Sequence, residues 1–450
     1  MTKVCIIGAG PSGLSLAWQL ERAGISFDLY ERNSDVGGLW DIDNPGSPMY
    51  ESAHFISSKT MSGFSNAPMP DSFADYPSHK DILNYIRAFT KQKGLYQHIR
   101  FNSEVKNAQQ VNGKWVVSVA GLEDKHYETL VCANGVNWHP SIPTLKGQDS
   151  FNGEIMHAQK YKTAEQFRGK KVLIVGAGNS GCDIACDAAQ FADEAHISMR
   201  RGYHFVPKHI FGTPSDVFDS KGPEMPMWIK QKVFPGLLRM LEGNPQRLGL
   251  PKPDHKIFES HPILNSQMWH YLRHGDIKVQ KDIDYLDGDY VVFKDGQKQK
   301  VDLILLATGY RSLIPYLKND YIQYEGDRPQ TYLNLFSRDV PNLITLGFME
   351  TNSGAYAMFD YMAHMVTQYL LDKTRNPQNA SKFELLIKND DPDLSGGVNY
   401  VKSDRHANYI NKAAYMKYLK KLDKRMKWTP LDKLNKSEGS ISVELEAVEV

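Results

Sequence analysis

The chain has 450 residues, with 53 Lys plus Arg against 52 Asp plus Glu, and therefore a formal net charge of +1. This length exceeds one ordinary domain and predicts two or three. The balanced charge gives no argument for nucleic acid as a partner, because such binding depends on clustered positive charge.

The four cysteines are Cys5, Cys132, Cys182 and Cys186, and none forms a CxxC pair. This scatter indicates neither a disulfide framework nor a metal site. The first predicted strand begins at Lys3, which leaves no room for a signal peptide. No apolar run approaches the roughly 20 residues that cross a bilayer. We therefore expect a cytoplasmic protein without a membrane anchor or a metal.

The N-terminal segment has the pattern of a dinucleotide-binding unit. Residues 3–7 (KVCII) predict a short buried strand, and the loop GAGPSG follows. The next residues have helical periodicity up to Gly24, and a second strand ends at Glu31. A strand, turn, helix and strand in about 30 residues have the size of a βαβ unit.

Further along the chain, this pattern occurs a second time. A helix is predicted over 79–93, and strands over 115–119 and 127–135. Residues 170–181 (KKVLIVGAGNSG) then repeat the opening segment, followed by a helix and by a strand over 194–201. The apolar segment 301–310 resembles 127–135. The repeat indicates an internal duplication of a supersecondary unit.

The remaining segments are less regular. Residues 212–275 are rich in Pro, Gly, Met and aromatic residues, and predict an insertion of helices and loops. Helices are predicted over 355–372 and, with a basic amphipathic pattern, over 405–428. The tail over 435–450 predicts a frayed end or an edge strand.

Together these patterns predict an α/β fold with two Rossmann-like dinucleotide-binding domains. Residues 1–155 and 296–450 are expected to form one discontinuous dinucleotide-binding domain. Residues 165–295 are expected to form a second, inserted one that carries the insertion at about 212–275.

Each glycine of the two loops is expected to have a distinct structural role. The first of each set, Gly8 or Gly176, permits the tight turn out of the strand, and the second lets a pyrophosphate approach the backbone. The third permits close packing of helix on strand. The phosphates then lie at a helix N-terminus, where free N–H groups favour negative charge.

The ends of the two second strands predict different nucleotides. Glu31 ends the second strand of the first unit, where a carboxylate accepts hydrogen bonds from ribose hydroxyls and repels a 2′-phosphate. Arg200 and Arg201 end the second strand of the other unit, where guanidinium groups suit a 2′-phosphate. We therefore expect FAD at the first loop and NADPH at the second. Residues 1–155 and 296–450 are then the FAD-binding domain, and residues 165–295 the NADPH-binding domain.

The segment between the loops carries a resemblance to a known family. Residues 151–161 read FxGxxxHxxxY, with Phe151, Gly153, His157 and Tyr161 at the fixed positions. This pattern, together with LLATGY over 305–310, resembles the flavin-containing monooxygenases. The related Baeyer–Villiger monooxygenases end the first motif with Trp and then Pro or Asp, whereas this chain has Tyr161 and Lys162.

The resemblance implies a mechanism and a set of contacts. NADPH reduces FAD, the reduced flavin binds O2 as a C4a-hydroperoxyflavin, and a nitrogen or sulfur of a small molecule takes one oxygen atom. No catalytic side chain is assigned, because the cofactor carries the chemistry. The residues expected to bind the cofactors are Gly8, Gly10, Pro11, Ser12, Gly13, Glu31, Gly38, Leu39, Trp40, Val105, Gly135, Gly176, Gly178, Asn179, Ser180, Gly181, Arg200, Arg201, Gly309 and Asn352.

One position departs from the family pattern. Members commonly have an Asn beside the flavin in a segment resembling SNxxKE, and alignment on Lys59 puts Ile56 there. Ile cannot form that hydrogen bond, although Ser57 or Ser58 could replace it. Three alternatives therefore stay open: a Baeyer–Villiger-type enzyme, an uncoupled NADPH oxidase, and a nucleotide-binding module without turnover. The oligomeric state is also open, with a homodimer among the options.

Overall fold

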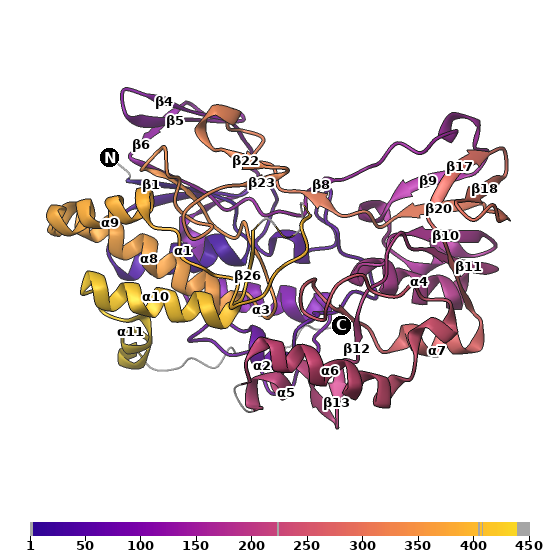
Figure 1. Cartoon of the computed structure of the whole chain (residues 1–450). Coiled ribbons are helices and arrows are strands. Elements are labelled where there is room, and N and C mark those ends of the chain that lie inside the picture. Colours follow the sequence, from indigo (N-terminus) through magenta and orange to yellow (C-terminus); the bar gives the residue numbers. More distant parts are fainter. Residues whose placement is uncertain (1–2, 223–224, 404–405, 407, 439–450) are drawn as a thin grey trace.

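The computed structural model describes residues 3–222, 225–403, 406 and 408–438. Two α/β halves lie side by side, with the N-terminal strands and the C-terminal helices in one half and the middle of the chain in the other (Figure 1). The chain crosses between the halves twice. The two crossings, β8 (His139–Pro140) and β21 (Tyr310–Arg311), pair with each other as antiparallel strands.

The first half is built on a five-stranded parallel sheet. Its order is β24 (Leu343–Thr345), β7 (Thr129–Cys132), β1 (Val4–Ile7), β2 (Phe27–Tyr30) and β3 (Ile99–Arg100). The four residues of β1 and of β7 are all buried. Short strands that are wholly buried and mostly apolar are typical of parallel sheets covered on both faces.

The second half repeats this arrangement. Its parallel sheet has the order β9 (Glu154–His157), β20 (Leu303–Leu306), β10 (Lys171–Val175), β11 (Glu194–Ser198) and β16 (Ile277–Gln280). Each half also has a three-stranded antiparallel sheet. These are β4 (Val105–Val111), β5 (Lys114–Val119) and β6 (Lys125–Tyr127) in the first, and β17 (Ile283–Asp287), β18 (Tyr290–Phe293) and β19 (Lys298–Lys300) in the second. The predicted duplication is therefore confirmed.

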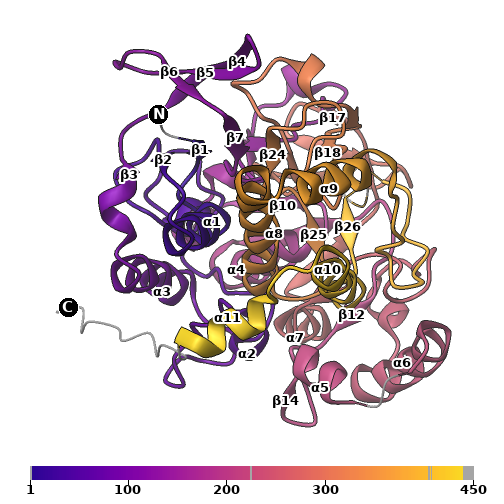
Figure 2. The same ribbon diagram turned by 90° about the vertical axis from the view of Figure 1, so that its left-hand side faces the viewer.

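Helices cover both sheets. In the first half α1 (Pro11–Arg22) packs against the long α8 (Tyr356–Arg375), and Ser15 Oγ donates to Asp360 Oδ1 at 2.8 Å between them. The helix α3 (His79–Gln92) begins at a capping box of Ser78 and Asp81. The helices α9 (Pro377–Asn389), α10 (Lys412–Met426) and α11 (Leu431–Glu438) lie around α8 (Figure 2).

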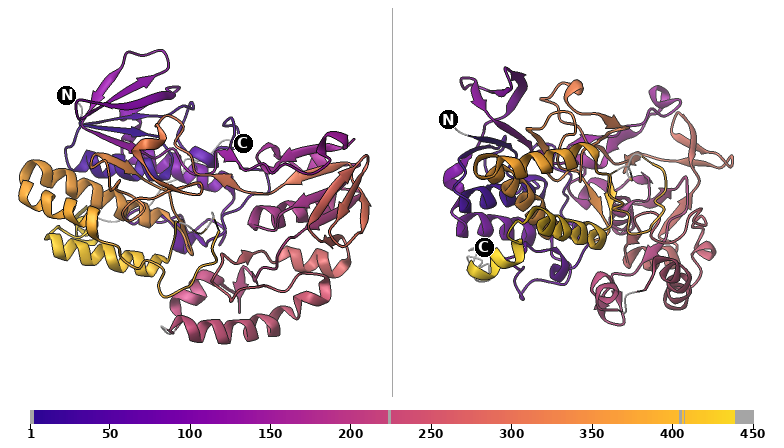
Figure 3. Two further views of the ribbon diagram at one scale, coloured as in Figure 1. Left: turned by 45° about the horizontal axis from the view of Figure 1, so that its top comes forward. Right: turned by 60° about the vertical axis from the view of Figure 1, so that its left-hand side comes forward.

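The second sheet is covered by α4 (Asn179–Phe191) and α7 (Gln267–His274), which contact each other. Between β11 and α7 the chain forms an insertion below the two halves (Figure 3). Its elements are β12 (Phe205–Val206), β13 (His209–Ile210), β14 (Thr213–Pro214), α5 (Ser215–Lys221), α6 (Met227–Glu242) and β15 (Ile263–Leu264).

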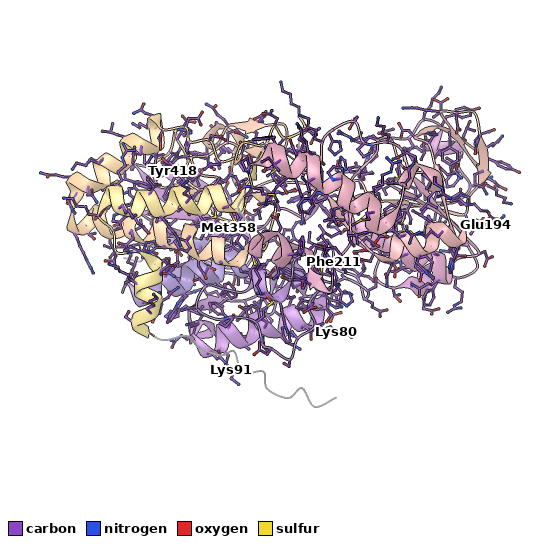
Figure 4. The ribbon with its side chains drawn as sticks, turned by 60° about the horizontal axis from the view of Figure 1, so that its bottom comes forward. Lys80, Lys91, Glu194, Phe211, Met358 and Tyr418 are labelled. Atoms are coloured by element: carbon purple, nitrogen blue, oxygen red, sulfur yellow. The ribbon has the colours of Figure 1, made fainter. Side chains whose placement is uncertain are left out.

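The insertion contacts the first half at α2 (Lys59–Ser62) and nearby loops. Ser58 N donates to Asp216 Oδ2 at 2.7 Å, and α2 packs on α5. Viewed from below, Phe211 of the insertion lies between Met358 of the first half and Glu194 of the second (Figure 4). The insertion therefore contributes to holding the two halves together.

Several expected bounds differ from the structure. The strands β9 and β20 pair inside the second sheet, although both lie outside the range 165–295 expected for that domain. The helix α7 leads directly into β16, so it is the crossover helix of the second sheet and not part of the insertion. Parallel pairing joins strands far apart in the sequence, so a short apolar run does not indicate its sheet.

At the C-terminal end, the helix expected over 405–428 begins at Lys412, because Asn411 caps it with an Oδ1 that accepts from Ala414 N. Before the cap, β26 (Tyr409–Ile410) pairs with β25 (Glu350–Thr351). The small hairpin of β22 (Tyr324–Glu325) and β23 (Arg328–Pro329) lies in the same half. Residues 435–438 are helical in α11, and the rest of the expected tail lies outside the described residues.

Candidate active site

The first and third glycines of the first loop, Gly8 and Gly13, are required by the close packing of the backbone around them. Gly8 has a φ of +110°, and a Cβ built there would lie 2.5 Å from Ala133 O of the next strand end. A Cβ on Gly13 would lie 2.0 Å from Gly8 O. Both contacts are shorter than any Cβ tolerates, so the strand end and helix α1 approach each other only with glycine at these positions.

The second loop has the same geometry. Gly176 has a φ of +103°, and its Cβ would lie 2.6 Å from Ala307 O. A Cβ on Gly181 would lie 2.0 Å from Gly176 O. The two loops are therefore structural copies, and each follows the central strand of its sheet.

The middle glycines behave differently. Gly10 and Gly178 have φ values of −78° and −71°, which any residue can adopt. No described atom lies within 4 Å of a Cβ built on Gly178, and the nearest to one on Gly10 is Gly38 Cα at 3.8 Å. Nothing within the described chain requires glycine here. A group bound against the backbone would require it, as the pyrophosphate of a dinucleotide does.

The helices behind the loops have free N-termini. Within the described residues, neither α1 nor α4 has a side chain that caps its first turn, whereas α3 has a full capping box. Uncapped N–H groups need an acceptor, and a phosphate at the loop supplies one. The residues present therefore fit the dinucleotides expected at both loops.

The strand ends beside the loops differ in chemistry. Glu31 follows β2 directly, is buried, and accepts from Ala9 N of the glycine loop at 2.8 Å. The register places Met199 at the same position after β11 in the second half. Met199 is buried and cannot repel a phosphate. The structural counterpart of Glu31 is thus Met199, and the two arginines follow it.

The two arginines are not equivalent. Arg200 is exposed, whereas Arg201 Nη2 lies 2.6 Å from Asp254 Oδ1 of the insertion. Both residues follow β11 at the edge that carries the second glycine loop, because Gly176 N donates to Ser198 O at 3.1 Å. Both predicted arginines therefore lie beside the loop, and one of them already has an acidic partner.

The segment Gly38–Trp40 lies against the first loop. Gly38 has a φ of +59°, and its Cβ would lie 3.2 Å from Gly10 Cα. Leu39 O accepts from Ser47 Oγ at 2.7 Å. Trp40 stacks on Phe55 with ring centroids 5.0 Å apart, and Phe55 meets Tyr356 edge-on at 5.8 Å. An aromatic wall thus extends from the first loop to the start of α8.

The segment 56–58 divides between surface and interior. Ile56, which the alignment on Lys59 predicts at the position of the family's Asn, is 36% exposed. Ser57 Oγ accepts from Ser62 Oγ at 2.9 Å. The Ser58 hydroxyl is fully buried and has no hydrogen-bond partner among the described residues. Of the two serines, Ser58 has the uncommitted hydroxyl.

The motif at 151–161 connects the halves. His157 is buried at the end of β9; its Nδ1 accepts from Gln159 N at 3.1 Å, so its Nε2 donates to Gly309 O at 3.1 Å. Burial lowers the pKa of His157, which favours the neutral ring. Tyr161 OH donates to Asp187 Oδ2 of α4 at 2.8 Å. These two side chains therefore tie the linker to the end of β20 and to α4.

Two acidic residues of α4, which the sequence did not lead us to expect in the site, accept hydrogen bonds from side chains of the first half. We call Asp183 and Asp187, with the groups that bind them, the α4 seam. Ser52 Oγ donates to Asp187 Oδ2 at 2.5 Å, and Tyr50 OH reaches Asp183 Oδ2 at 3.4 Å. Burial raises the pKa of Asp183 to about 6 and raises that of Asp187. A signal existed: two carboxylates stand one helical turn apart in the otherwise apolar CDIACDAA.

The other predicted site residues have these places. Pro11 and Ser12 form the first turn of α1, and Asn179 and Ser180 that of α4. Gly135 and Gly309, with φ of +78° and +87°, follow β7 and β20. Val105 begins β4. The side chains of Asn179 and Asn352 already accept from Leu264 N and Lys412 N, both at 2.9 Å, so they are engaged by the protein.

Metal binding and membrane insertion each have their own structural requirements. Among the described residues, no group of three or more His, Cys, Asp or Glu side chains is placed to hold a metal ion. Within the same ranges, none of the helices combines the length and apolar character needed to cross a bilayer.

Two glycine loops on duplicated sheets define a class: oxidoreductases with two dinucleotide-binding domains. The family model described as Flavin-binding monooxygenase-like matches residues 1–430. The chain therefore belongs to this family, and the predicted fold and the prediction of a flavin-dependent monooxygenase are confirmed. The expected cofactors, FAD and NADPH, agree with the family.

Individual relatives support this placement. The probable indole-3-pyruvate monooxygenase YUCCA3 of Arabidopsis thaliana is 29% identical over 80% of this chain and 84% of its own length. The N-oxide-forming dimethylaniline monooxygenase 2 of Rattus norvegicus is 29% identical over 84% of this chain and 75% of its own. In fold, the structure resembles the NADP+-bound cyclohexanone monooxygenase from Rhodococcus sp. Phi1, with a TM-score of 0.70 at 16% identity, covering 95% of this chain and 98% of that chain.

Proposed function

We propose that this monooxygenase binds FAD at the first glycine loop and NADPH at the second, and transfers one oxygen atom from O2 to a nitrogen or sulfur of a small molecule. The observation that carries the cofactor assignment is the difference between equivalent strand ends. Glu31 follows β2, whereas Met199, Arg200 and Arg201 follow β11. A carboxylate suits ribose hydroxyls, and an apolar residue followed by guanidinium groups suits a 2′-phosphate.

The residues of each loop have separate roles in this proposal. Gly10 and Gly178 admit the pyrophosphates, and the first turns of α1 and α4 donate N–H groups to them. When bound, the flavin accepts a hydride from NADPH and activates O2. The chain holds the two nucleotides so that they can meet and keeps water away from the flavin.

The α4 seam gives the chain a means of holding the two sites together. It joins the loop after Gly38–Trp40 to the helix that begins at the second glycine loop. We infer that this seam, with the paired crossings β8 and β21, sets the distance between the two nucleotides. A cytoplasmic location is also part of the proposal, and the four buried, unpaired cysteines support it.

The substrate class rests on the relatives' names. One relative is N-oxide-forming, another is named for indole-3-pyruvate, and the similar fold belongs to a cyclohexanone monooxygenase. The ending of the 151–161 motif, Tyr161-Lys162, favours oxygenation of a soft nucleophile over a Baeyer–Villiger reaction on a ketone. Ile56 favours a second candidate, an NADPH oxidase that releases hydrogen peroxide, because the Ile side chain could donate no hydrogen bond to a bound flavin.

The test is a substrate panel with the FAD-loaded enzyme: a tertiary amine, a thioether and a cyclic ketone. For each compound, NADPH consumed, oxygenated product and hydrogen peroxide are measured together. Product from the amine or the thioether that accounts for most of the NADPH supports the proposal. Product from the ketone alone supports the Baeyer–Villiger alternative, and peroxide equal to NADPH for every compound supports the oxidase.

A further inference from the structure

The guanidinium of Arg201 is held by a short acidic contact from the insertion. Its Nη2 lies 2.6 Å from Asp254 Oδ1, and the same oxygen lies 2.8 Å from His255 Nδ1. His255 is in turn fixed, because its side chain is only 5% exposed and its carbonyl oxygen bonds His204 Nε2 at 2.9 Å. Asp254 is 60% exposed, and its carboxylate is oriented by these two contacts, from Arg201 and from the buried His255.

The backbone beside Arg201 is also fixed by the insertion. A Cβ built on Gly202 would lie 2.3 Å from Pro251 O and 2.4 Å from Lys252 C, so no side chain fits there. Residues 251–255 thus cover the turn that follows β11. This contact holds Arg201 toward Asp254 and leaves Arg200 on the outside.

The two guanidinium groups therefore differ in whether they already have an acidic partner when a phosphate approaches. Arg200 is exposed and forms no ion pair with any described residue. Arg201 Nη2 already has Asp254 as its ion-pair partner, a carboxylate whose pKa is lowered to about 2 by His255 and Arg201. A 2′-phosphate beside Arg201 would have to approach that negative charge, and like charges at close range repel.

We propose that Asp254 is a specificity-determining residue: it occupies Arg201, leaves Arg200 as the group that reads the 2′-phosphate, and limits the affinity for that phosphate. This inference rests on the proposed binding of NADPH at the second loop. It replaces the simpler expectation that both arginines grip the phosphate together.

The test uses the FAD-loaded enzyme and two adenosine nucleotides, adenosine 2′,5′-bisphosphate and AMP, with binding measured by calorimetry. Arg200→Ala should lower the affinity for the bisphosphate by about 10- to 100-fold, which is the range of a charge-assisted contact to phosphate. The affinity for AMP should not change. Asp254→Asn should raise the affinity for the bisphosphate by about 3- to 10-fold, again without an effect on the affinity for AMP. The control Asp219→Asn, which removes the 2.6 Å pair with Lys230 in the same insertion, should change neither.

A double variant separates the two roles of Arg201. Arg201→Ala alone removes the guanidinium partner of Asp254, leaves its contact with His255, and should weaken binding of the bisphosphate. Adding Asp254→Asn to this variant should restore the affinity for the bisphosphate at least to that of the wild type. If the double variant stays as weak as Arg201→Ala, or if Asp254→Asn alone gives no gain, Arg201 binds the phosphate directly and the inference is wrong. If Arg200→Ala weakens both nucleotides equally, or if neither binds the wild type, the proposed NADPH site itself fails.

Discussion

Asp183 is a buried carboxyl whose environment makes it sensitive to pH. It accepts from Asn265 Nδ2 at 2.6 Å, and burial raises its pKa to about 6, from 3.8. Between these values the folded protein binds more protons at this site than the unfolded chain does. Its contribution to stability is therefore fully present below about pH 4 and is lost as the pH rises through 6.

Replacing this acid gives a prediction about the pH profile. On raising the pH from 5 to 7.5, the wild type should lose about 1 kcal/mol of unfolding free energy more than Asp183→Asn does. The measurement is urea unfolding of both proteins at the two pH values. A difference that stays constant with pH would show that Asp183 does not titrate in this range.

Ile56 gives a second prediction at the scale of one residue. Ile56→Asn introduces the polar side chain that the alignment on Lys59 predicts beside the flavin. If that side chain adds one hydrogen bond worth about 1 kcal/mol, the share of NADPH lost as hydrogen peroxide should fall by about fivefold. Peroxide and product are measured in the same assay, with Ile56→Leu as the apolar control. An equal effect of both substitutions would contradict the prediction.

At this scale the spacing of residues in the sequence predicts part of the second nucleotide site. Met199 follows Gly181 at the same spacing at which Glu31 follows Gly13, so the counterpart of Glu31 could have been found by counting. The pair of Arg201 and Asp254 could not, because the two residues are 53 positions apart in the sequence, with α5 and α6 between them. Contacts of that kind depend on tertiary packing rather than on periodicity.

At the scale of elements, the glycine loops combine two requirements that substitution can separate. Gly176 has a positive φ and no room for a Cβ, whereas Gly178 has an ordinary φ and open space. Gly176→Ala should therefore lower the unfolding free energy by about 3 kcal/mol through strain and overlap. Gly178→Ala should leave the thermal unfolding midpoint nearly unchanged.

In catalysis, the substitution that leaves stability unchanged, Gly178→Ala, should have a clear effect. Gly178→Ala should raise the KM for NADPH by about tenfold or more, because a methyl group would meet the bound pyrophosphate. Thermal unfolding by circular dichroism and steady-state kinetics check the two halves of this prediction. Normal NADPH kinetics in a folded Gly178→Ala enzyme would show that no nucleotide approaches this backbone.

Elements with a strong periodic pattern were predicted well, and those defined by partners were not. The helix expected over 79–93 is α3 (His79–Gln92), because its capping residues are local. The strand expected over 194–201 ends at Ser198, where pairing with β16 ends. The short β26 inside an expected helix depends on β25, which lies far away in the sequence, and no local pattern indicates it.

At the scale of the whole molecule, the α4 seam predicts communication between the halves. Asp187→Ala removes the acceptor of Ser52 and Tyr161 together, whereas Tyr161→Phe removes one donor only. Asp187→Ala should slow flavin reduction by NADPH by about tenfold, and Tyr161→Phe should have a smaller effect. AMP binding should be unchanged in both. Slower reduction with equally weakened AMP binding would instead indicate damage to the nucleotide site.

The proposed function requires that electrons pass from NADPH at the second loop to FAD at the first. Rapid anaerobic mixing of the FAD-loaded enzyme with NADPH or with NADH tests this transfer directly, by following the visible absorbance of the oxidised flavin. We predict that NADPH bleaches the flavin within a catalytic turnover, and that NADH does so at least about tenfold more slowly at equal low concentration. A flavin that stays oxidised with NADPH, or that is reduced equally by both nucleotides, would contradict the assignment of the two loops.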